Sequence, residues 1–287
     1  MAWWIAMLLQ AATGGQTPPA EPPSPPPLHG GPAKTTCPIG GETFEAWHAG
    51  SYSTYGARPD GRPYSYMSFP FPLPECPGNR LIVLGTYSPA ELARLPAILA
   101  GAPYRRMIDR ETSYYRGAWL ATALGRGAVE ALDLLLQATW QAKDEADHKP
   151  ERRARTRRYQ TEFAERVAAL APDTRAPDRV WLQMRAANAL RELGRFREAE
   201  LMRRRAEASW RESDDSEGWD AVLARLRVVI ARRDGSSEPL DMIPESEAVR
   251  RCVDLAGRGE AFDRRFCAQP AIAARVAQIR PARRTSP

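Results

Sequence analysis

The chain has 287 residues, 43% of them hydrophobic, and carries a formal net charge of +6 at neutral pH. This length and hydrophobic content exclude a mostly disordered protein and allow one large domain or two small ones. The positive charge favours an acidic partner. Arginine supplies nearly all of it, in clusters that alternate with Glu and Ala and come with no DNA- or RNA-binding motif. We therefore interpret these clusters as solvated helix faces and predict that the protein does not bind nucleic acid.

The N-terminus, MAWWIAMLLQAATGGQ, holds an apolar run from Ala2 to Leu9. This run is too short for a membrane-spanning helix, which needs about 20 apolar residues, but it matches the apolar core of a signal peptide. We predict a signal peptide over residues 1–16, an exported and periplasmic protein, and no stable membrane span after the signal is removed. No Lys or Arg precedes Lys34. A misassigned start, a disordered tail or an uncleaved anchor therefore stays an alternative.

Two stretches precede the predicted helices. Residues 17–34, TPPAEPPSPPPLHGGPAK, are rich in proline, which holds the backbone extended, so we predict a linker that acts as a spacer. Residues 35–86 are rich in Gly, Pro, Tyr, Ser and Phe. They contain a predicted turn at Arg58-Pro59-Asp60-Gly61, and the best candidate strand is RLIVL, Arg80–Leu84. We predict a small β/loop module whose thin core needs a covalent or metal staple.

From Ser88 onward the pattern becomes helical. Ser88 suits an N-cap, and Glu91 suits the third helical position of a capping box. Pro89 between them suits the first helical position, where its missing N–H costs nothing. These residues predict a helix that begins after Ser88 and ends at Gly101.

Further helices follow with short links between them. They are predicted over residues 109–124, 127–148, 153–171, 177–193, 196–213, 217–233, 245–257 and 261–279. The last of them contains Pro270, which can divide it in two. Short links make consecutive helices antiparallel. We therefore predict a mainly α fold, in which an antiparallel helical-hairpin array over residues 87–280 follows the small β/loop module and precedes a tail over 281–287.

One predicted hairpin carries a more specific motif. Residues 177–210 contain RAANALRELGRFREAELMRRRAEASW, in which Ala186 and Ala187 allow a close helix crossing and Gly194 makes the turn. This stretch resembles a tetratricopeptide repeat (TPR). It departs from the family at Arg203, where an aromatic residue is usual, and no proline closes the repeat. The resemblance implies a TPR-like array with a concave groove that binds a peptide or a partner protein.

Candidate binding residues come from both regions. Arginines near the hairpin would give a groove positive charge, and loop tyrosines make good contact surfaces. The candidates are Arg195, Arg203 and Arg204 on the helices and Tyr52, Tyr55, Arg58, Asp60 and Arg62 on the small module. We predict a non-catalytic protein-binding or scaffold protein of the bacterial cell envelope.

The four cysteines fall into two neighbouring pairs. Three connectivities are possible, and joining Cys37 to Cys76 and Cys252 to Cys267 keeps each bond inside one module. Disulfides form in oxidising compartments, which agrees with the predicted export. The loop-entropy relation gives about 4 kcal/mol for the first bond and about 3 kcal/mol for the second. We predict both disulfides.

Buried free thiols are one alternative to the disulfides, and zinc is another for the first pair. Cys37 and Cys76 each begin a Cys-Pro sequence, as in a zinc knuckle, but Gly40 and Asn79 stand where the second cysteines belong. Together with the helices, the segment from Cys37 to Val83 resembles a poorly characterised bacterial family that joins a zinc-ribbon-like Cys-Pro-x-Cys-Gly segment to TPR-like helices. The zinc ligands would be Cys37, His48, Cys76 and Asp60. We predict no cofactor, and with zinc the protein would be a cytoplasmic regulatory or adaptor protein.

Catalytic motifs are scarce in this chain. It has three histidines, no Gly-x-Ser-x-Gly elbow and no glycine-rich phosphate loop. We therefore assign no catalytic residue and favour a protein that is not an enzyme. A hydrolase with an unrecognised site is the alternative, because carboxylate chemistry leaves no sequence signature.

Overall fold

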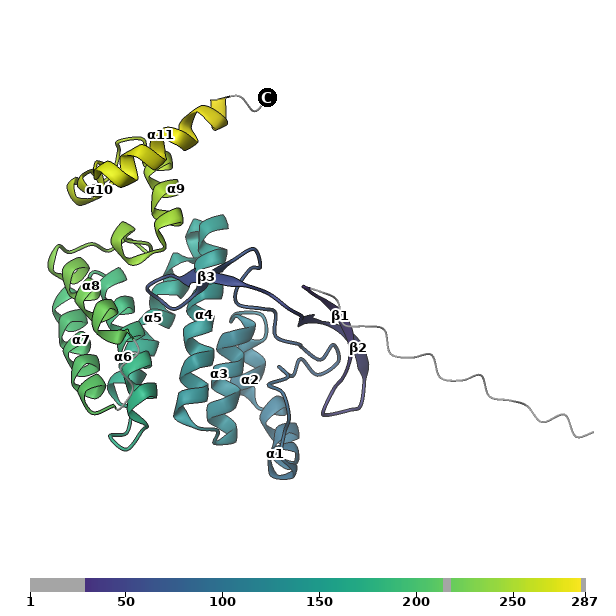
Figure 1. Ribbon diagram of the computed structural model, residues 1–287. Helices are drawn as coiled ribbons and strands as arrows, with labels where there is room; N and C mark the ends of the chain where they lie inside the picture. Colours follow the sequence, from purple (N-terminus) through teal and green to yellow (C-terminus); the bar gives the residue numbers. More distant parts are fainter. Residues whose placement is uncertain (1–28, 214–217, 285–287) are drawn as a thin grey trace, which may run out of the picture.

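The computed structural model describes residues 29–213 and 218–284, with side chains up to residue 279 (Figure 1). The predicted signal peptide and most of the predicted linker lie outside the described residues. The described chain is mainly helical, and a small β module comes before the helices. This arrangement confirms the predicted fold class.

The β module consists of two separate antiparallel hairpins. Strand β1 (Gly30–Thr36) pairs with β2 (Thr43–Ala49) along the full length of both strands. Strand β3 (Thr54–Ala57) pairs with β4 (Pro63–Ser65) in an irregular register. Residues 30–34 of the predicted linker therefore belong to a strand, because β2 supplies backbone partners that a proline-rich spacer would lack.

The predicted strand at Arg80–Leu84 is wrong. In this fully described stretch the structure forms an isolated bridge between Glu75 and Ile82 and no strand. Arg80 has a φ of +60°, which interrupts extended backbone. Leu81 and Ile82 are fully buried all the same. The apolar run thus reflects burial against the helices and not pairing with a neighbouring strand.

The helices follow the predicted caps. Ser88 makes the expected capping box with Glu91. Thr112 caps the third helix, so the predicted helix over 109–124 begins four residues late. Pro270 divides the last predicted helix in two. The helices are α1 (Pro89–Ala100), α2 (Ala102–Met107), α3 (Ser113–Leu124), α4 (Ala128–His148), α5 (Arg153–Ala168), α6 (Ala176–Glu192), α7 (Phe196–Arg211), α8 (Trp219–Ala231), α9 (Glu245–Leu255), α10 (Ala261–Cys267) and α11 (Pro270–Arg284), with short 3-10 turns η1 (Pro150–Arg152) and η2 (Leu240–Met242).

Helices α3 to α8 form the array, in which each helix packs against the next along the chain (Figure 1). Helix α6 also contacts both α4 and α8, so these three helices form one layer. Helices α5 and α7 both pack against one side of this layer. Leu135 and Phe163 belong to the shared core. Ala186 and Ala187 are fully buried, as a close helix crossing requires. We call the side of α4 and α6 that faces away from α5 and α7 the inner face.

The C-terminal helices make a second, smaller core. Ile243, Val249 and Ile272 pack together there, and Tyr64 of β4 joins them. The β module therefore contacts both ends of the molecule, since Cys37 and Cys76 pack with residues of α1 and α3. None of the described helices is long and apolar enough to cross a membrane.

Candidate functional site

The turn between β3 and β4, residues 58–62, lies on the inner face. Backbone hydrogen bonds close it, from the Arg58 N–H to the Arg62 carbonyl at 2.8 Å and from the Gly61 N–H to the Arg58 carbonyl at 2.8 Å. The Asp60 carboxylate accepts the Arg62 N–H at 3.1 Å. Gly61 has a φ of +88°, which favours glycine. The turn therefore has a defined shape of its own before any helix contacts it.

Side chains of α4 and α6 hold the backbone of this turn. Trp140 Nε1 donates to the Asp60 carbonyl at 3.2 Å, and Arg185 Nη1 donates to the Pro59 carbonyl at 2.8 Å. The Arg185 guanidinium lies over the Trp181 ring, 3.9 Å from its centre. A Cβ atom on Gly61 would lie 2.9 Å from Arg185 Nε and 3.2 Å from Trp181. The turn thus occupies part of the inner face.

Ion pairs complete this contact, and those made by Lys143 are buried. Lys143 Nζ lies 2.5 Å from Asp60 Oδ2 and 2.9 Å from Glu192 Oε2, and Arg62 pairs with Asp144. Burial opposes the charge on Asp60, but Lys143, the Arg62 N–H and Arg58 together outweigh it and hold the Asp60 pKa below its ordinary value of 3.8. Burial likewise opposes the charge on Lys143, and the two carboxylates nevertheless raise its pKa above 10.5. These groups are therefore charged partners within the fold.

Three of the residues predicted for a contact surface on the small module are thereby corrected. Asp60 and Arg62 are only 4% and 9% exposed. Arg58 forms an ion pair with Glu238 at 2.7 Å. Of the five candidates on the small module, Tyr52 and Tyr55 are the two that are exposed. The turn residues are charged because α4 and the C-terminal region present opposite charges to them, and not because the turn faces solvent.

The predicted arginines on the hairpin divide in a similar way. Arg203 is 6% exposed and pairs with Glu200 and Glu207, so it does not line a groove. Its long side chain packs its apolar stem inward while the guanidinium reaches these carboxylates. Arg195 pairs with Glu198, and the exposed Arg204 pairs with Glu200. The structure does not bring the three arginines together on the inner face.

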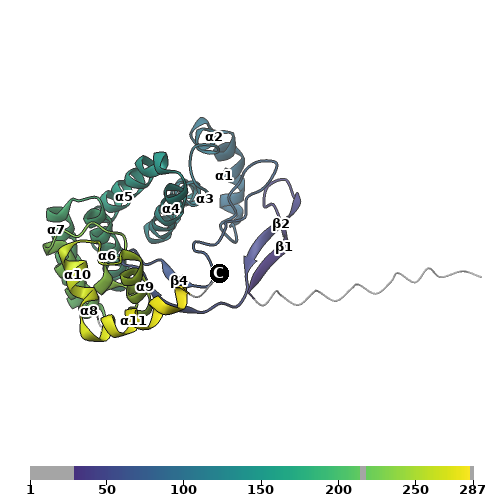
Figure 2. The ribbon, with the colours of Figure 1, turned by 90° about the horizontal axis from the view of Figure 1, so that it is seen from above.

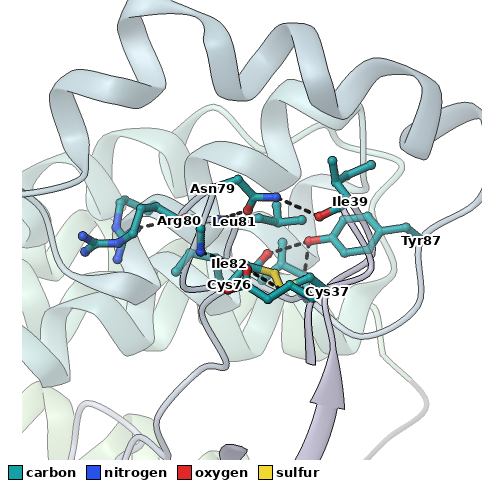
Figure 3. Close-up of a disulfide and its surroundings, with 12 residues drawn as sticks. Cys37, Ile39, Cys76, Asn79, Arg80, Leu81, Ile82 and Tyr87 are labelled. Atoms are coloured by element: carbon teal, nitrogen blue, oxygen red, sulfur yellow. Dashed lines mark hydrogen bonds between the residues drawn. A yellow bond between two sulfur atoms is a disulfide. The ribbon is translucent and has the colours of Figure 1, made fainter. Parts of the chain in front are cut away.

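The cysteines lie where the disulfide prediction puts them. Cys37 is bonded to Cys76, with Cα atoms 5.7 Å apart (Figure 3). Cys252 is bonded to Cys267, with Cα atoms 5.6 Å apart. Asn79, at a position where a zinc knuckle has cysteine, donates to the Ile39 carbonyl at 2.9 Å and accepts the Leu81 N–H at 3.0 Å. Asn79 therefore links the two Cys-Pro segments by hydrogen bonds.

The alternative zinc ligands are not brought together. His48 Nε2 lies 2.9 Å from Thr35 Oγ1, Asp60 binds Lys143, and Cys37 is bonded to Cys76. Across residues 29–213 and 218–284, no group of three or more His, Cys, Asp or Glu residues is placed to hold a metal ion.

A groove between α7 and α8 is the main feature that the sequence reasoning missed, and we call it the α7–α8 groove. Its volume is about 570 Å³, and its lining is apolar with an arginine rim. The lining residues are Phe196, Arg197, Glu200, Leu201, Arg204, Arg227, Ile230, Ala231 and Arg233. Leu201 is 61% exposed and lines this groove together with Phe196 and Ala231. The groove lies on the side of the molecule far from β1 and β2 (Figures 1 and 2).

The charges of the α7–α8 groove are largely unpaired. Among the described residues, no carboxylate pairs with Arg197 or Arg227, and Arg233 lies over the Phe196 ring at 4.9 Å. Arg204 pairs with Glu200, the one carboxylate in the described lining. A sequence signal for this groove does exist, because Leu201 lies off the buried stripe of α7 that contains Ala199, Met202 and Ala206.

Comparison of the chain with protein-family models, with curated proteins and with solved structures finds no match. The residues and their geometry therefore carry the functional argument.

Proposed function

We propose that this protein is an exported, non-catalytic scaffold of the bacterial cell envelope that holds a partner protein in the α7–α8 groove. The partner segment is an amphipathic helix with acidic residues beside its apolar stripe. The carrying observation is the apolar lining of the groove, to which Phe196, Leu201 and Ile230 contribute, within an arginine rim. The exposed Leu201 adds nothing to the core, but it gives a partner an apolar contact.

Charge complementarity selects the acidic partner. Arg197 and Arg227 have no carboxylate partner in the described chain, so they are free to pair with carboxylates of another molecule. Arginine suits this role because its guanidinium forms two parallel hydrogen bonds to a carboxylate. An apolar centre with an arginine rim also has the composition of a binding hot spot.

The TPR resemblance supports a helical array that binds proteins, but it implies a different surface. In TPR-like arrays the concave side receives the partner. Here residues 58–62 already occupy the inner face through Trp140, Lys143 and Arg185. This occupancy leads us to place the partner in the α7–α8 groove. The two disulfides support the exported location, since such bonds persist in oxidising compartments.

Binding of a designed peptide tests the proposal. The probe is a labelled helical peptide with leucines at i, i+3, i+4 and i+7 and flanking glutamates, titrated by fluorescence polarisation. Leu201→Asp should weaken its Kd at least tenfold, because it places a charge in the apolar centre. The matched control is Val228→Asp, since Val228 is also exposed, at 48%, but does not line the groove.

The charges are tested in the same assay. Replacing both Arg197 and Arg227 by Gln should lower the affinity and flatten its dependence on salt. A peptide with Gln in place of Glu should bind the wild type more weakly. Equal binding by the Leu201→Asp and Val228→Asp variants, or no binding by the wild type, would contradict the proposal.

A further inference from the structure

A second pocket, which we call the α4–α5 pocket, lies apart from the α7–α8 groove. It has a volume of about 350 Å³ and is formed by α4, α5, the end of α6, the turn at Arg58 and the loop at residues 235–237. Its lining residues are Arg58, Lys143, Ala146, Asp147, Arg153, Thr156, Arg157, Gln160, Glu192, Gly235 and Ser237. The two sites share no lining residue, so one can be tested without the other.

The deep cations of this pocket are already paired. Lys143 binds Asp60 and Glu192, and Arg58 pairs with Glu238. Arg153 and Arg157 differ, because no carboxylate of the described chain pairs with either of them. Both are exposed and lie one turn apart on α5. Two like charges at this spacing repel each other, so the helix itself gains nothing from them.

Helix α5 continues directly from η1, whose Pro150 carbonyl accepts the Arg153 N–H. Arg153 begins α5, whose first turn contains no acidic residue and whose N-cap makes no side-chain hydrogen bond. The N-terminal end of a helix already carries a partial positive charge and normally attracts acidic side chains. Here η1 supplies Glu151, and Glu145 pairs with Arg152 and Arg155. Arg153 and Arg157 are the arginines of the pocket lining that remain without a carboxylate in the described chain.

The inner part of the pocket is polar. Gln160 is 5% exposed and donates to Glu192 at 2.6 Å, and Thr156 is 9% exposed and donates to the Ala142 carbonyl at 3.0 Å. Ser237 adds a hydroxyl from the opposite loop. Asp147 is the carboxylate of the lining that has no pairing partner in the described chain, and it excludes a second negative group nearby.

We propose that the α4–α5 pocket binds a small polar molecule with one anionic group, a carboxylate or a phosphate, held between Arg153 and Arg157. The guanidinium fork of arginine fits both groups. The body of the molecule lies toward Gln160, Thr156 and Ser237, whose polar atoms suit hydrogen bonding. This site is independent of the protein partner proposed above, because its residues lie outside the α7–α8 groove.

Calorimetric titration of the purified chain tests the site. The probes are 3-hydroxybutyrate, with its neutral amide as control, and glycerol phosphate, with glycerol as control. The wild type should bind at least one of the two anions and neither neutral compound. The Arg153→Gln, Arg157→Gln double variant should weaken that binding at least tenfold. The anion that binds more tightly identifies the group.

Two further variants make the result specific. Arg175→Gln removes an exposed arginine at the start of α6, outside the pocket, and should leave the Kd within twofold of the wild type. Asp147→Asn removes the unpaired carboxylate of the lining and should tighten binding severalfold. All of these side chains are exposed, so the variants should fold, which circular dichroism checks.

Three outcomes would overturn the proposal. They are no binding of either anion by the wild type, equal weakening by Arg175→Gln and by the double variant, and equal binding of the neutral controls.

Discussion

The inner face and the α7–α8 groove use the same materials in opposite ways. Both place arginines beside apolar side chains between two helices. On the inner face Lys143 pairs with Asp60 and Glu192. Arg185, which pairs with no carboxylate of the described chain, donates to the Pro59 carbonyl. In the α7–α8 groove, Arg197 and Arg227 find none among the described residues. The comparison shows that pairing, and not the presence of arginine, separates a structural surface from a candidate binding surface.

A disulfide also closes the loop that carries the turn at residues 58–62. Cys37 and Cys76 close a loop, and the turn at residues 58–62 lies between them in sequence. The disulfide packs with residues of α1 and α3, whereas the turn lies on α4 and α6. The disulfide and the ion pairs therefore hold one loop at two separate places. Changes in the free energy of unfolding measure how strongly these two attachments hold the turn on the inner face.

The largest effect is expected at Lys143. Lys143→Met leaves Asp60 and Glu192 buried without their cation, which should lower the free energy of unfolding by about 5 kcal/mol, the upper end for a broken buried pair. Denaturation in urea measures this loss. Lys149→Met is the matched control, because Lys149 is an exposed lysine at the end of the same helix and should change stability by less than about 0.5 kcal/mol.

Acid sharpens the same test. The Asp60 pKa lies below its ordinary 3.8 in the folded protein, so the pairing stabilises the fold fully above that pH. This contribution is lost as the pH falls through the lowered folded value. The stability difference between wild type and Lys143→Met should therefore shrink at acid pH. A difference below about 1 kcal/mol at neutral pH would show that the pairing does not hold the turn.

The disulfides come next. Replacing Cys37 and Cys76 by Ala opens a loop of 39 residues and should cost about 4 kcal/mol, against about 3 kcal/mol for Cys252 and Cys267 with a separation of 15. Hydrogen exchange should rise at residues 58–62 in the first variant and stay unchanged there in the second. Peptide binding in the α7–α8 groove should survive both changes. Equal hydrogen exchange at residues 58–62 in the two variants would mean that the Cys37–Cys76 disulfide does not help to hold the turn on the inner face.

Local patterns predicted most of the helices and both cysteine pairs. Ser88 and Glu91 specify a helix start through their own side chains, and Pro270 specifies a break. Each disulfide joins cysteines of one region, so spacing alone favoured it. These features depend on residues within one region of the sequence, so the sequence alone is enough to predict them.

The contact between the turn and the inner face could not be predicted from local patterns. Asp60 and Lys143 are 83 positions apart, and no local period connects them. A turn sequence with three charged residues also looks the same whether it faces water or opposite charges, so Arg58, Asp60 and Arg62 were predicted as candidate binding residues. The strand at Arg80–Leu84 failed for a related reason, because burial against helices produces the same apolar run as pairing in a sheet.

The smallest of these effects is expected at Gly61, and it tests the fit of the turn most directly. Gly61→Ala meets both the strain of a φ of +88° and contact with Arg185 and Trp181, so we expect a loss of about 2 kcal/mol. Gly85→Ala is the matched control. Gly85 also has a positive φ, +78°, but nothing lies within 4 Å of the added atom, so only the backbone strain of about 1 kcal/mol remains.

The difference between these two variants isolates the contact with the inner face. Arg185 has little freedom to move, because it donates to the Pro59 carbonyl and lies against Trp181. The Gly61 variant should therefore lose about 1 kcal/mol more than the Gly85 variant in chemical denaturation. Equal losses of stability in the two variants would mean that the inner face accommodates an added methyl group at no cost. An inner face that accommodates a methyl group would leave room for a partner there. The contrast with the α7–α8 groove would then no longer decide where the partner binds.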